Sequence, residues 1–331
     1  MKEFDIEYYN SFYRNKGVEP YKLDKLTYPD VRTNASQTRL INEEGKEVGT
    51  KGDMYHKLIM DRILQEGCFD YNPRPKYEDG TPAYTLSCNH GICTYDLTKG
   101  ESPLITLRPI AVKSGIGEVL WIYQDTSNDL EVLKDKYGVT WWDLWDIGNR
   151  TIGAVYGETV RRRDLMKKLL EELKKDPDGR RHIICLWQVD DFKEPHGLTP
   201  CAFLTIWNIR HGRDGQDYLD MELIQRSSDF DTAGCINQVQ YLALMMMVAK
   251  HLNIKPGRFT WCYDNIQIYD RHINQTIDML NRDPIDCKPK IVLNSNIDNF
   301  YDFTVDDVKI EGYPRKLIQE KNPQLKFPLG I

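Results

Sequence analysis

Apolar and polar positions in the second half of the chain follow two different periods. Runs rich in β-branched and aromatic residues predict four strands: RHIICLWQV, AFLTIWNIR, YLDMELIQRSSDF and RFTWCYDNIQIYD. A long apolar run over residues 237–252, between the last two of these, predicts a buried helix. Because strands outnumber crossover helices in this half, we predict an α+β fold, in which helices cover one large mixed β-sheet in a single domain.

The first half of the chain predicts mainly helices and loops. One helix is expected from residue 53 to Gly67, and another within AVKSGIGEVLWIYQ. The segment DLMKKLLEELKKDPDG predicts an amphipathic helix with Asp164 as its N-cap, and LSCNHGICTYDL predicts a strand. Residues 1–52 are polar and rich in tyrosine, so we expect them to form an N-terminal extension packed on the core.

Composition and charge limit the classes of function. The hydrophobic fraction is 40%, the charged fraction 28% and the net charge −6, which disfavours binding to DNA. The start of the chain has no apolar segment typical of a secretory signal, and the uncharged run 232–249 contains Asn, Gln and Gly. We therefore expect no membrane span, and a cytoplasmic protein whose eight cysteines are reduced thiols.

The segment CNHGIC is the nearest approach to a metal-binding pattern. It contains Cys88, His90 and Cys93, but no second CxxC pair follows that could complete a tetrahedral site. On a regular strand Cys88 and His90 would point to one face and Cys93 to the other. We therefore predict no metal.

Cys201, in GLTPCAF, is the candidate nucleophile. A thiolate needs a nearby cation or hydrogen-bond donors, and the segment lacks the signature of papain-type proteases. Taken alone, it is equally compatible with a buried structural cysteine. Arginines beside serine hydroxyls suit a phosphate monoester, and the candidates are Arg74, Arg180, Arg181 and Arg226 with Ser227 and Ser228.

Taken together, these motifs resemble the family of folate-dependent thymidylate synthases and pyrimidine hydroxymethylases. The order along the chain is GEVLW, TWWDLW, AVYG, RRHIICLW, LTPCAF, QRSSDF, INQVQYLAL, NIQIYDRH and KFPLGI. The resemblance covers residues 53–331 and implies one catalytic domain with the thymidylate synthase fold, while residues 1–52 lie outside it.

The resemblance implies a methyltransferase of nucleotide biosynthesis that converts dUMP to dTMP. Its co-substrate would be 5,10-methylenetetrahydrofolate, which donates carbon and hydride and leaves as dihydrofolate. Cys201 would add to C6 of the uracil, so that C5 becomes an enolate carbon able to attack the methylene group. Asn237 would donate to O4 and accept from N3–H, which selects uracil over cytosine.

The resemblance also assigns roles to other residues. Glu118, an acid in an apolar run with an expected raised pKa, would move protons near O4, and Tyr156 would help to remove the C5 proton. Arg226 would also favour the Cys201 thiolate. The remaining substrate contacts would come from Arg74, Gln225, Arg226, Ser227, Ser228, Asp229, Gln267 and Tyr269, and the folate contacts from Trp142, Trp145, Asp229, Arg108 and the C-terminal Ile331. Arg180 and Arg181 would reach the phosphate from the other subunit of a homodimer.

The chain departs from the family pattern at several positions. Many members carry histidine where this chain has Ala202 and Gln267, and Arg108 often aligns with lysine. The loop FDTAGCIN, before Asn237, is also unusual. These changes affect residues expected to contact the sugar and the folate, and Cys201 is retained. We therefore expect a divergent but active enzyme.

Three alternatives remain open from the sequence. A dUMP or dCMP hydroxymethylase of the same fold would quench the intermediate with water instead of hydride. A catalytically silent nucleotide- or RNA-binding homologue would keep the phosphate site, and an unrelated α+β protein would use Cys201 only for packing.

Overall fold

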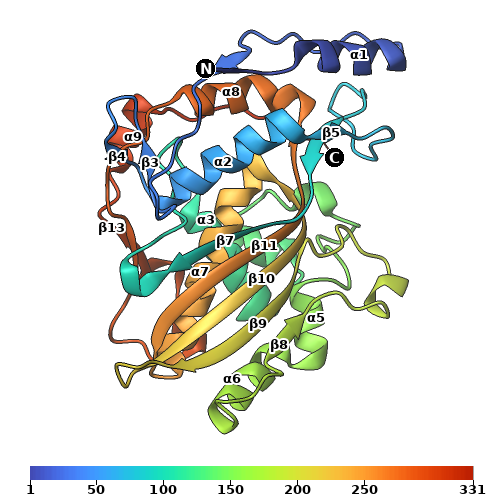
Figure 1. The fold of residues 1–331 in the computed structure, drawn as a ribbon. Helices are drawn as coiled ribbons and strands as arrows, with labels where there is room; N and C mark the ends of the chain where they lie inside the picture. The colour runs from blue at the N-terminus through green and yellow to red at the C-terminus, as the bar shows by residue number, and fades with distance from the viewer. Residues whose placement is uncertain (331) are drawn as a thin grey trace.

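A mixed sheet of seven strands forms the centre of the structure, a computed structural model that describes residues 1–330 (Figure 1). Its strand order is β5-β6-β11-β10-β9-β8, and β7 pairs with β11 beside β6. The pair β10–β11 is parallel and the other pairs are antiparallel, which confirms the predicted mixed sheet. The strands are β5 (Cys68–Phe69), β6 (Thr85–Cys88), β7 (Gly91–Asp96), β8 (Ile183–Cys185), β9 (Ala202–His211), β10 (Asp217–Asp229) and β11 (Lys255–Tyr269).

The parallel pairing of β10 and β11 brings polar side chains to one end of the sheet. Ser228 lies opposite Ile266, and Asp229 lies opposite Gln267. The register between β10 and β9 shifts at Gln225, which then pairs with Ala202. The bulge and the shared strand ends therefore place the segment after Cys201 beside the QRSSDF segment.

Two helices, α3 (Val112–Tyr123) and α7 (Cys235–His251), pack against each other behind the sheet (Figure 1). Gly115 permits their close contact, because a Cβ atom at this position would lie 2.9 Å from Ile236. The other helices are α1 (Ile6–Lys16), α2 (Lys51–Glu66), α4 (Leu130–Tyr137), α5 (Gly157–Arg163), α6 (Leu165–Lys175), α8 (Ile273–Asn281) and α9 (Arg315–Lys321). Within the described residues, no helix is long and apolar enough to cross a membrane.

Most predicted elements are present, with local differences. The helix expected from residue 53 is α2, which a capping box of Thr50 and Asp53 starts. Asp164 occupies the N-cap position of α6, as predicted, but its φ of 51° is left-handed and its side chain makes no cap hydrogen bond. The single strand expected over LSCNHGICTYDL is divided into β6 and β7, because His90 adopts a φ of 58°.

Residues 1–52 form α1 and four short strands that pair two by two. Tyr9, Phe12 and Tyr13 of α1 are buried and belong to the main hydrophobic core. The strands are β1 (Lys2–Glu3) with β2 (Thr27–Tyr28) and β3 (Leu40–Ile41) with β4 (Glu47–Val48), and a further pair near the C-terminus is β12 (Lys290–Leu293) with β13 (Val308–Glu311). The division of the chain into an extension and a catalytic domain at residue 52 stays a prediction.

Candidate active site

A cavity of about 730 Å³ opens where β10 and β11 end, beside α3 and the start of α7. It gathers residues from distant parts of the sequence. The predicted site residues that line it are Arg74, Glu118, Trp142, Trp145, Tyr156, Cys201, Gln225, Arg226, Ser227, Ser228, Asp229, Asn237, Gln267 and Tyr269. Ala202, where the chain departs from the family pattern, lines it too.

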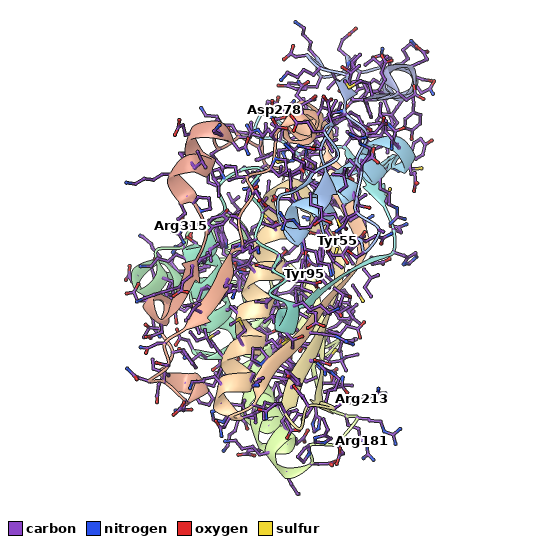
Figure 2. All side chains as sticks on the ribbon, turned by 60° about the vertical axis from the view of Figure 1, so that its left-hand side comes forward. Tyr55, Tyr95, Arg181, Arg213, Asp278 and Arg315 are labelled. Atoms are coloured by element: carbon purple, nitrogen blue, oxygen red, sulfur yellow. The ribbon has the colours of Figure 1, made fainter. Side chains whose placement is uncertain are left out.

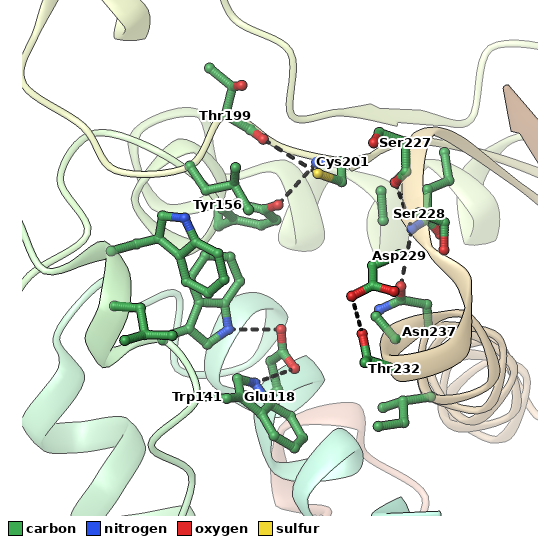
Figure 3. Close-up of a pocket in the computed structure, with 18 of the residues that line it drawn as sticks. Glu118, Trp141, Tyr156, Thr199, Cys201, Ser227, Ser228, Asp229, Thr232 and Asn237 are labelled. Atoms are coloured by element: carbon green, nitrogen blue, oxygen red, sulfur yellow. Dashed lines mark hydrogen bonds between the residues drawn. The ribbon is translucent and has the colours of Figure 1, made fainter. Parts of the chain in front are cut away.

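Cys201 precedes β9 directly and lies in the wall of this cavity (Figure 3). Its sulfur is 3.5 Å from Nη2 of Arg226. The same guanidinium donates to the carbonyl oxygens of Pro200 at 2.9 Å and Thr199 at 2.8 Å, so it also holds the segment before the cysteine. Arg226 is thus both a cation near the sulfur and a brace for its backbone.

Burial raises the pKa of the Cys201 thiol above its ordinary value. The positive charge of Arg226, a hydrogen bond with Tyr156 and the charge of Arg74 act in the opposite direction. Burial outweighs these three influences, so the role of Arg226 in forming the thiolate stays a prediction. The thiolate depends on the surrounding cations, because the apolar wall disfavours its charge.

Tyr156 lies beneath the cysteine, and its hydroxyl accepts a hydrogen bond from the Cys201 backbone N–H at 3.0 Å (Figure 3). The tyrosine has a φ of 51° and a ψ of −111°, a rare conformation for a residue with a side chain. The next residue, Gly157, packs against backbone, since a Cβ there would lie 2.0 Å from the Ser127 carbonyl oxygen. This strained turn directs the phenol hydroxyl to the backbone of Cys201.

Glu118, on α3, is buried and accepts three hydrogen bonds. The donors are the indole N–H groups of Trp141 at 3.1 Å and Trp142 at 2.9 Å (Figure 3). The third donor is Nε2 of Gln240 at 2.8 Å. Burial raises the pKa of Glu118, as predicted, while the three donors lower it. The site therefore holds a carboxyl group suited to proton exchange.

Asn237 lies on the first turn of α7, and its amide orientation is set by two glutamines. Its Oδ1 accepts from Gln225 at 3.0 Å, and its Nδ2 donates to Gln240 at 2.9 Å. Gln225 is itself fixed, because its Oε1 accepts from the Trp261 indole at 2.9 Å. Asn237 is not the N-cap of α7, which starts after Gly234. Its second N–H and second lone pair have no partner among the described residues, so a ligand could bind them.

Two buried polar atoms at the end of β10 have no hydrogen-bond partner among the described residues. They are Oγ of Ser228 and Oδ1 of Asp229. The other Asp229 oxygen accepts from Thr232 at 2.6 Å. Burial raises the pKa of the Asp229 carboxyl, and the nearby His272 lowers it. Unpaired polar atoms in a cavity wall are typical of groups that bind a polar ligand.

Three predicted residues do not line the cavity. Arg180 and Arg181 are exposed, and Figure 2 shows Arg181 at the lower end of the molecule near Arg213. Arg108 is buried and donates to the carbonyl oxygens of Asp231 at 2.6 Å and Thr232 at 3.3 Å. In this structure Arg108 therefore supports the loop before α7. The predicted folate contact at Ile331 lies outside the described residues.

Other residues of the cavity wall were not predicted. Trp141 and Gln240 bind Glu118, and Thr199 binds Arg226 through its hydroxyl at 3.0 Å. Leu329 and Gly330 also line the cavity. A sequence signal existed for Gln240, because it follows Asn237 by three residues and so shares its helix face. For Thr199 there was none beyond its proximity to Cys201.

Comparison with known proteins gives a consistent result. The sequence model of the family described as Thymidylate synthase matches residues 53–326. Thymidylate synthases of Streptococcus pneumoniae are 47% identical over 284 residues, which is 85% of this chain and 100% of the relative. That of Lactococcus lactis subsp. cremoris is 46% identical over 283 residues, again 85% and 100%. The structure of thermostable thymidylate synthase A from Bacillus subtilis is similar with a TM-score of 0.76 and 31% identity, over 85% of this chain and 99% of that one.

Proposed function

The chain belongs to the thymidylate synthase family and catalyses the reductive methylation of dUMP to dTMP, and we propose that Cys201 carries the reaction by adding to C6 of the uracil. The observation that supports this role is the position of its sulfur, in the cavity wall and 3.5 Å from the Arg226 guanidinium. Hydroxymethylation, the alternative left open by the sequence, is not favoured by the names of the relatives.

The proposed addition turns C5 of the pyrimidine into a nucleophile. The C6–S bond forms as the C5–C6 π electrons move toward C5, and negative charge develops on O4. The free N–H of Asn237 donates to O4, and its free lone pair accepts from N3–H. Because two glutamines hold this amide, it is set in advance for the enolate.

Proton transfers fall to Glu118 and Tyr156 in this proposal. Glu118 holds a proton more tightly than an exposed carboxyl, so it can deliver one toward O4 and take it back. Tyr156 accepts a hydrogen bond from the backbone of Cys201, the proposed nucleophile, and we assign removal of the C5 proton to this hydroxyl. Product release then requires expulsion of the Cys201 thiolate, which the Arg226 charge favours.

The family uses 5,10-methylenetetrahydrofolate as its co-substrate, which supplies the one-carbon unit and the hydride. The cavity wall suits such a group. It has apolar surface from Trp142, Trp145 and Ile236, and a carboxylate oxygen on Asp229 that has no hydrogen-bond partner within residues 1–330. We propose that the indoles pack against the ring system and that Asp229 accepts from its N–H groups. Arg108 would act indirectly, through the loop that it holds.

The phosphate of dUMP is proposed to bind Arg74, Arg226 and Ser227 at the cavity edge, with Tyr269 and Gln267 toward the ribose. We propose a homodimer in which Arg180 and Arg181 complete the phosphate site of the partner. Their exposure supports this, as does the absence of any side-chain hydrogen bond or ion pair to them within residues 1–330. Their guanidinium groups are thus available to another chain.

Formation of dihydrofolate from dUMP and methylenetetrahydrofolate tests the reaction, with dCMP as the competing substrate. Cys201→Ser should abolish turnover and trapping by 5-fluoro-dUMP, and Cys68→Ser, at an exposed cysteine, should leave both unchanged. Full turnover by Cys201→Ser would contradict the proposal that Cys201 is the nucleophile. A hydroxymethyl product with tetrahydrofolate left over would overturn methylation.

Subunit complementation tests the shared site. Cys201→Ala and the double variant Arg180→Glu/Arg181→Glu should each be inactive alone. Random mixing gives heterodimers with one intact site, so activity should recover to about a quarter of wild type. No recovery from a mixture shown to contain heterodimers would contradict the shared site.

A further inference from the structure

Helix α1 of the N-terminal extension covers both ends of the loop that carries Arg74. This loop, residues 70–84, lies between β5 and β6. The Phe12 ring is 4.6 Å from that of Phe69, at the end of β5, and 5.1 Å from that of Tyr84, which precedes β6. In Figure 1, α1 lies across the top of the molecule, next to the hairpin that includes β5. The loop therefore starts and ends against the extension.

Polar contacts join the same helix to the interior of the loop. Lys16 donates to the carbonyl oxygen of Tyr71, and its Nζ is 4.9 Å from the centre of the Tyr71 ring. The hydroxyls of Tyr13 and Tyr77 donate to opposite oxygens of the Asp270 carboxylate. Asp270 is only 4% exposed. A buried carboxylate at the end of β11 thus connects α1 to the middle of the loop.

The position of Arg74 depends on the backbone of this loop. Arg74 lines the cavity, yet no hydrogen bond or ion pair to its side chain occurs in the described part of the chain. Pro73 and Pro75 flank it and restrict its backbone, and the Pro75 carbonyl accepts from Ala83 at 3.0 Å. A displacement of the loop would therefore move the arginine with it.

We propose that α1 is a positioning element for the nucleotide: Tyr13 and Lys16 hold residues 70–84 so that Arg74 meets the substrate phosphate. This inference rests on the proposed binding of dUMP in the cavity. Residues 1–52 lie outside the match to the family model, so the device belongs to the extension of this chain. Tyr13 and Lys16 act through the loop and touch neither the cavity nor the reacting atoms.

Steady-state kinetics of the full-length enzyme tests the proposal. Tyr13→Phe and Lys16→Met should each raise KM for dUMP about three- to tenfold, with kcat and the folate KM unchanged. Tyr28→Phe is the matched control. It removes a partly buried hydrogen bond between the extension and the core, from Gln65 at 2.7 Å, and residue 28 lies outside the loop. It should lower the melting temperature but leave KM unchanged.

A double-variant cycle shows whether the effect passes through Arg74. In an Arg74→Gln background, Tyr13→Phe should not weaken dUMP binding further, because the group that it positions is gone. Additive losses would overturn the proposal, as would an unchanged KM in both Tyr13→Phe and Lys16→Met, or an equal rise in Tyr28→Phe. Failure of the proposed function is distinguishable, because the wild-type enzyme would then show no turnover of dUMP.

Discussion

Gln240 of α7 donates a hydrogen bond to Glu118 of α3 at 2.8 Å. The same amide accepts from Asn237 at 2.9 Å, so one side chain connects the proposed proton carrier to the proposed pyrimidine-binding group. The contact exists because Gly115 lets the two helices approach closely. The orientation of two functional groups therefore depends on a residue that touches both.

Replacement of Gln240 by Met should lower kcat about ten- to a hundredfold, because Glu118 loses a donor and the Asn237 amide becomes free to rotate. Steady-state kinetics with dUMP measures this. Gln238→Met is the matched control: Gln238 is buried on the same helix but bonds Tyr95 and Gly234, away from the cavity. Equal losses of kcat in both variants would show a structural effect only.

Arg226→Gln should make the Cys201 thiol harder to ionise. The arginine charge lowers the pKa of the thiol, whereas burial raises it. Without the arginine the pKa should therefore rise, and the pH midpoint of alkylation by iodoacetamide should move upward. The kcat/KM for dUMP should fall by about two orders of magnitude. Arg210→Gln, at an arginine paired with Asp220, should change neither quantity. An unchanged alkylation midpoint would mean that Arg226 acts on the phosphate alone.

Asn237→Asp should change the pyrimidine preference. A carboxylate accepts from the 4-amino group of cytosine but cannot donate to O4 of uracil. The ratio of kcat/KM for dUMP to that for dCMP should therefore fall at least about a hundredfold. Competition between the two nucleotides for the same enzyme measures the ratio. An unaltered preference for dUMP over dCMP would show that a group other than Asn237 recognises O4 of the pyrimidine.

Asp231→Asn should stabilise the protein at alkaline pH. Burial raises the pKa of Asp231 from its ordinary value of 3.8 to about 6, against the opposing charges of His272 and Arg108. The folded protein thus binds more protons than the unfolded chain, so this contribution to stability is complete below pH 3.8 and is lost as the pH rises through 6. At pH about 8 the variant should gain up to about 3 kcal/mol in free energy of unfolding.

Urea unfolding at several pH values checks that gain, which should shrink toward pH about 4. Asp135→Asn, which removes an exposed carboxyl from the surface, is the control for the substitution itself. If the free energies of unfolding of Asp231→Asn and wild type differed by the same amount at every pH, the effect of the substitution would not come from titration of Asp231.

The periodicity of apolar residues was sufficient to predict the long helices and strands, because their buried positions recur at regular intervals along the sequence. The strands β9, β10 and β11 and the helices α3 and α7 lie where alternating and apolar runs predict them. Short elements were less accessible. The strand β8 has only three residues, His90 adopts its left-handed conformation where its N–H donates to Asp264, and Asp164 is a left-handed C-cap at the end of α5. The motifs around Cys201 and Asn237 indicated the family, because several specific segments occur in the order typical of its members.

The sequence by itself determined the α+β class, the family and many of the polar residues that line the cavity, because local patterns and motif order carry that information. Tertiary structure decided which groups meet. Arg226 approaches Cys201 because two strands pair, and Gln240 joins Glu118 because α3 and α7 cross at Gly115. Trp141 reaches Glu118 from the segment after α4, and Arg108 supports a loop instead of lining the cavity. These contacts arise from packing between segments far apart in the chain, which no local pattern encodes.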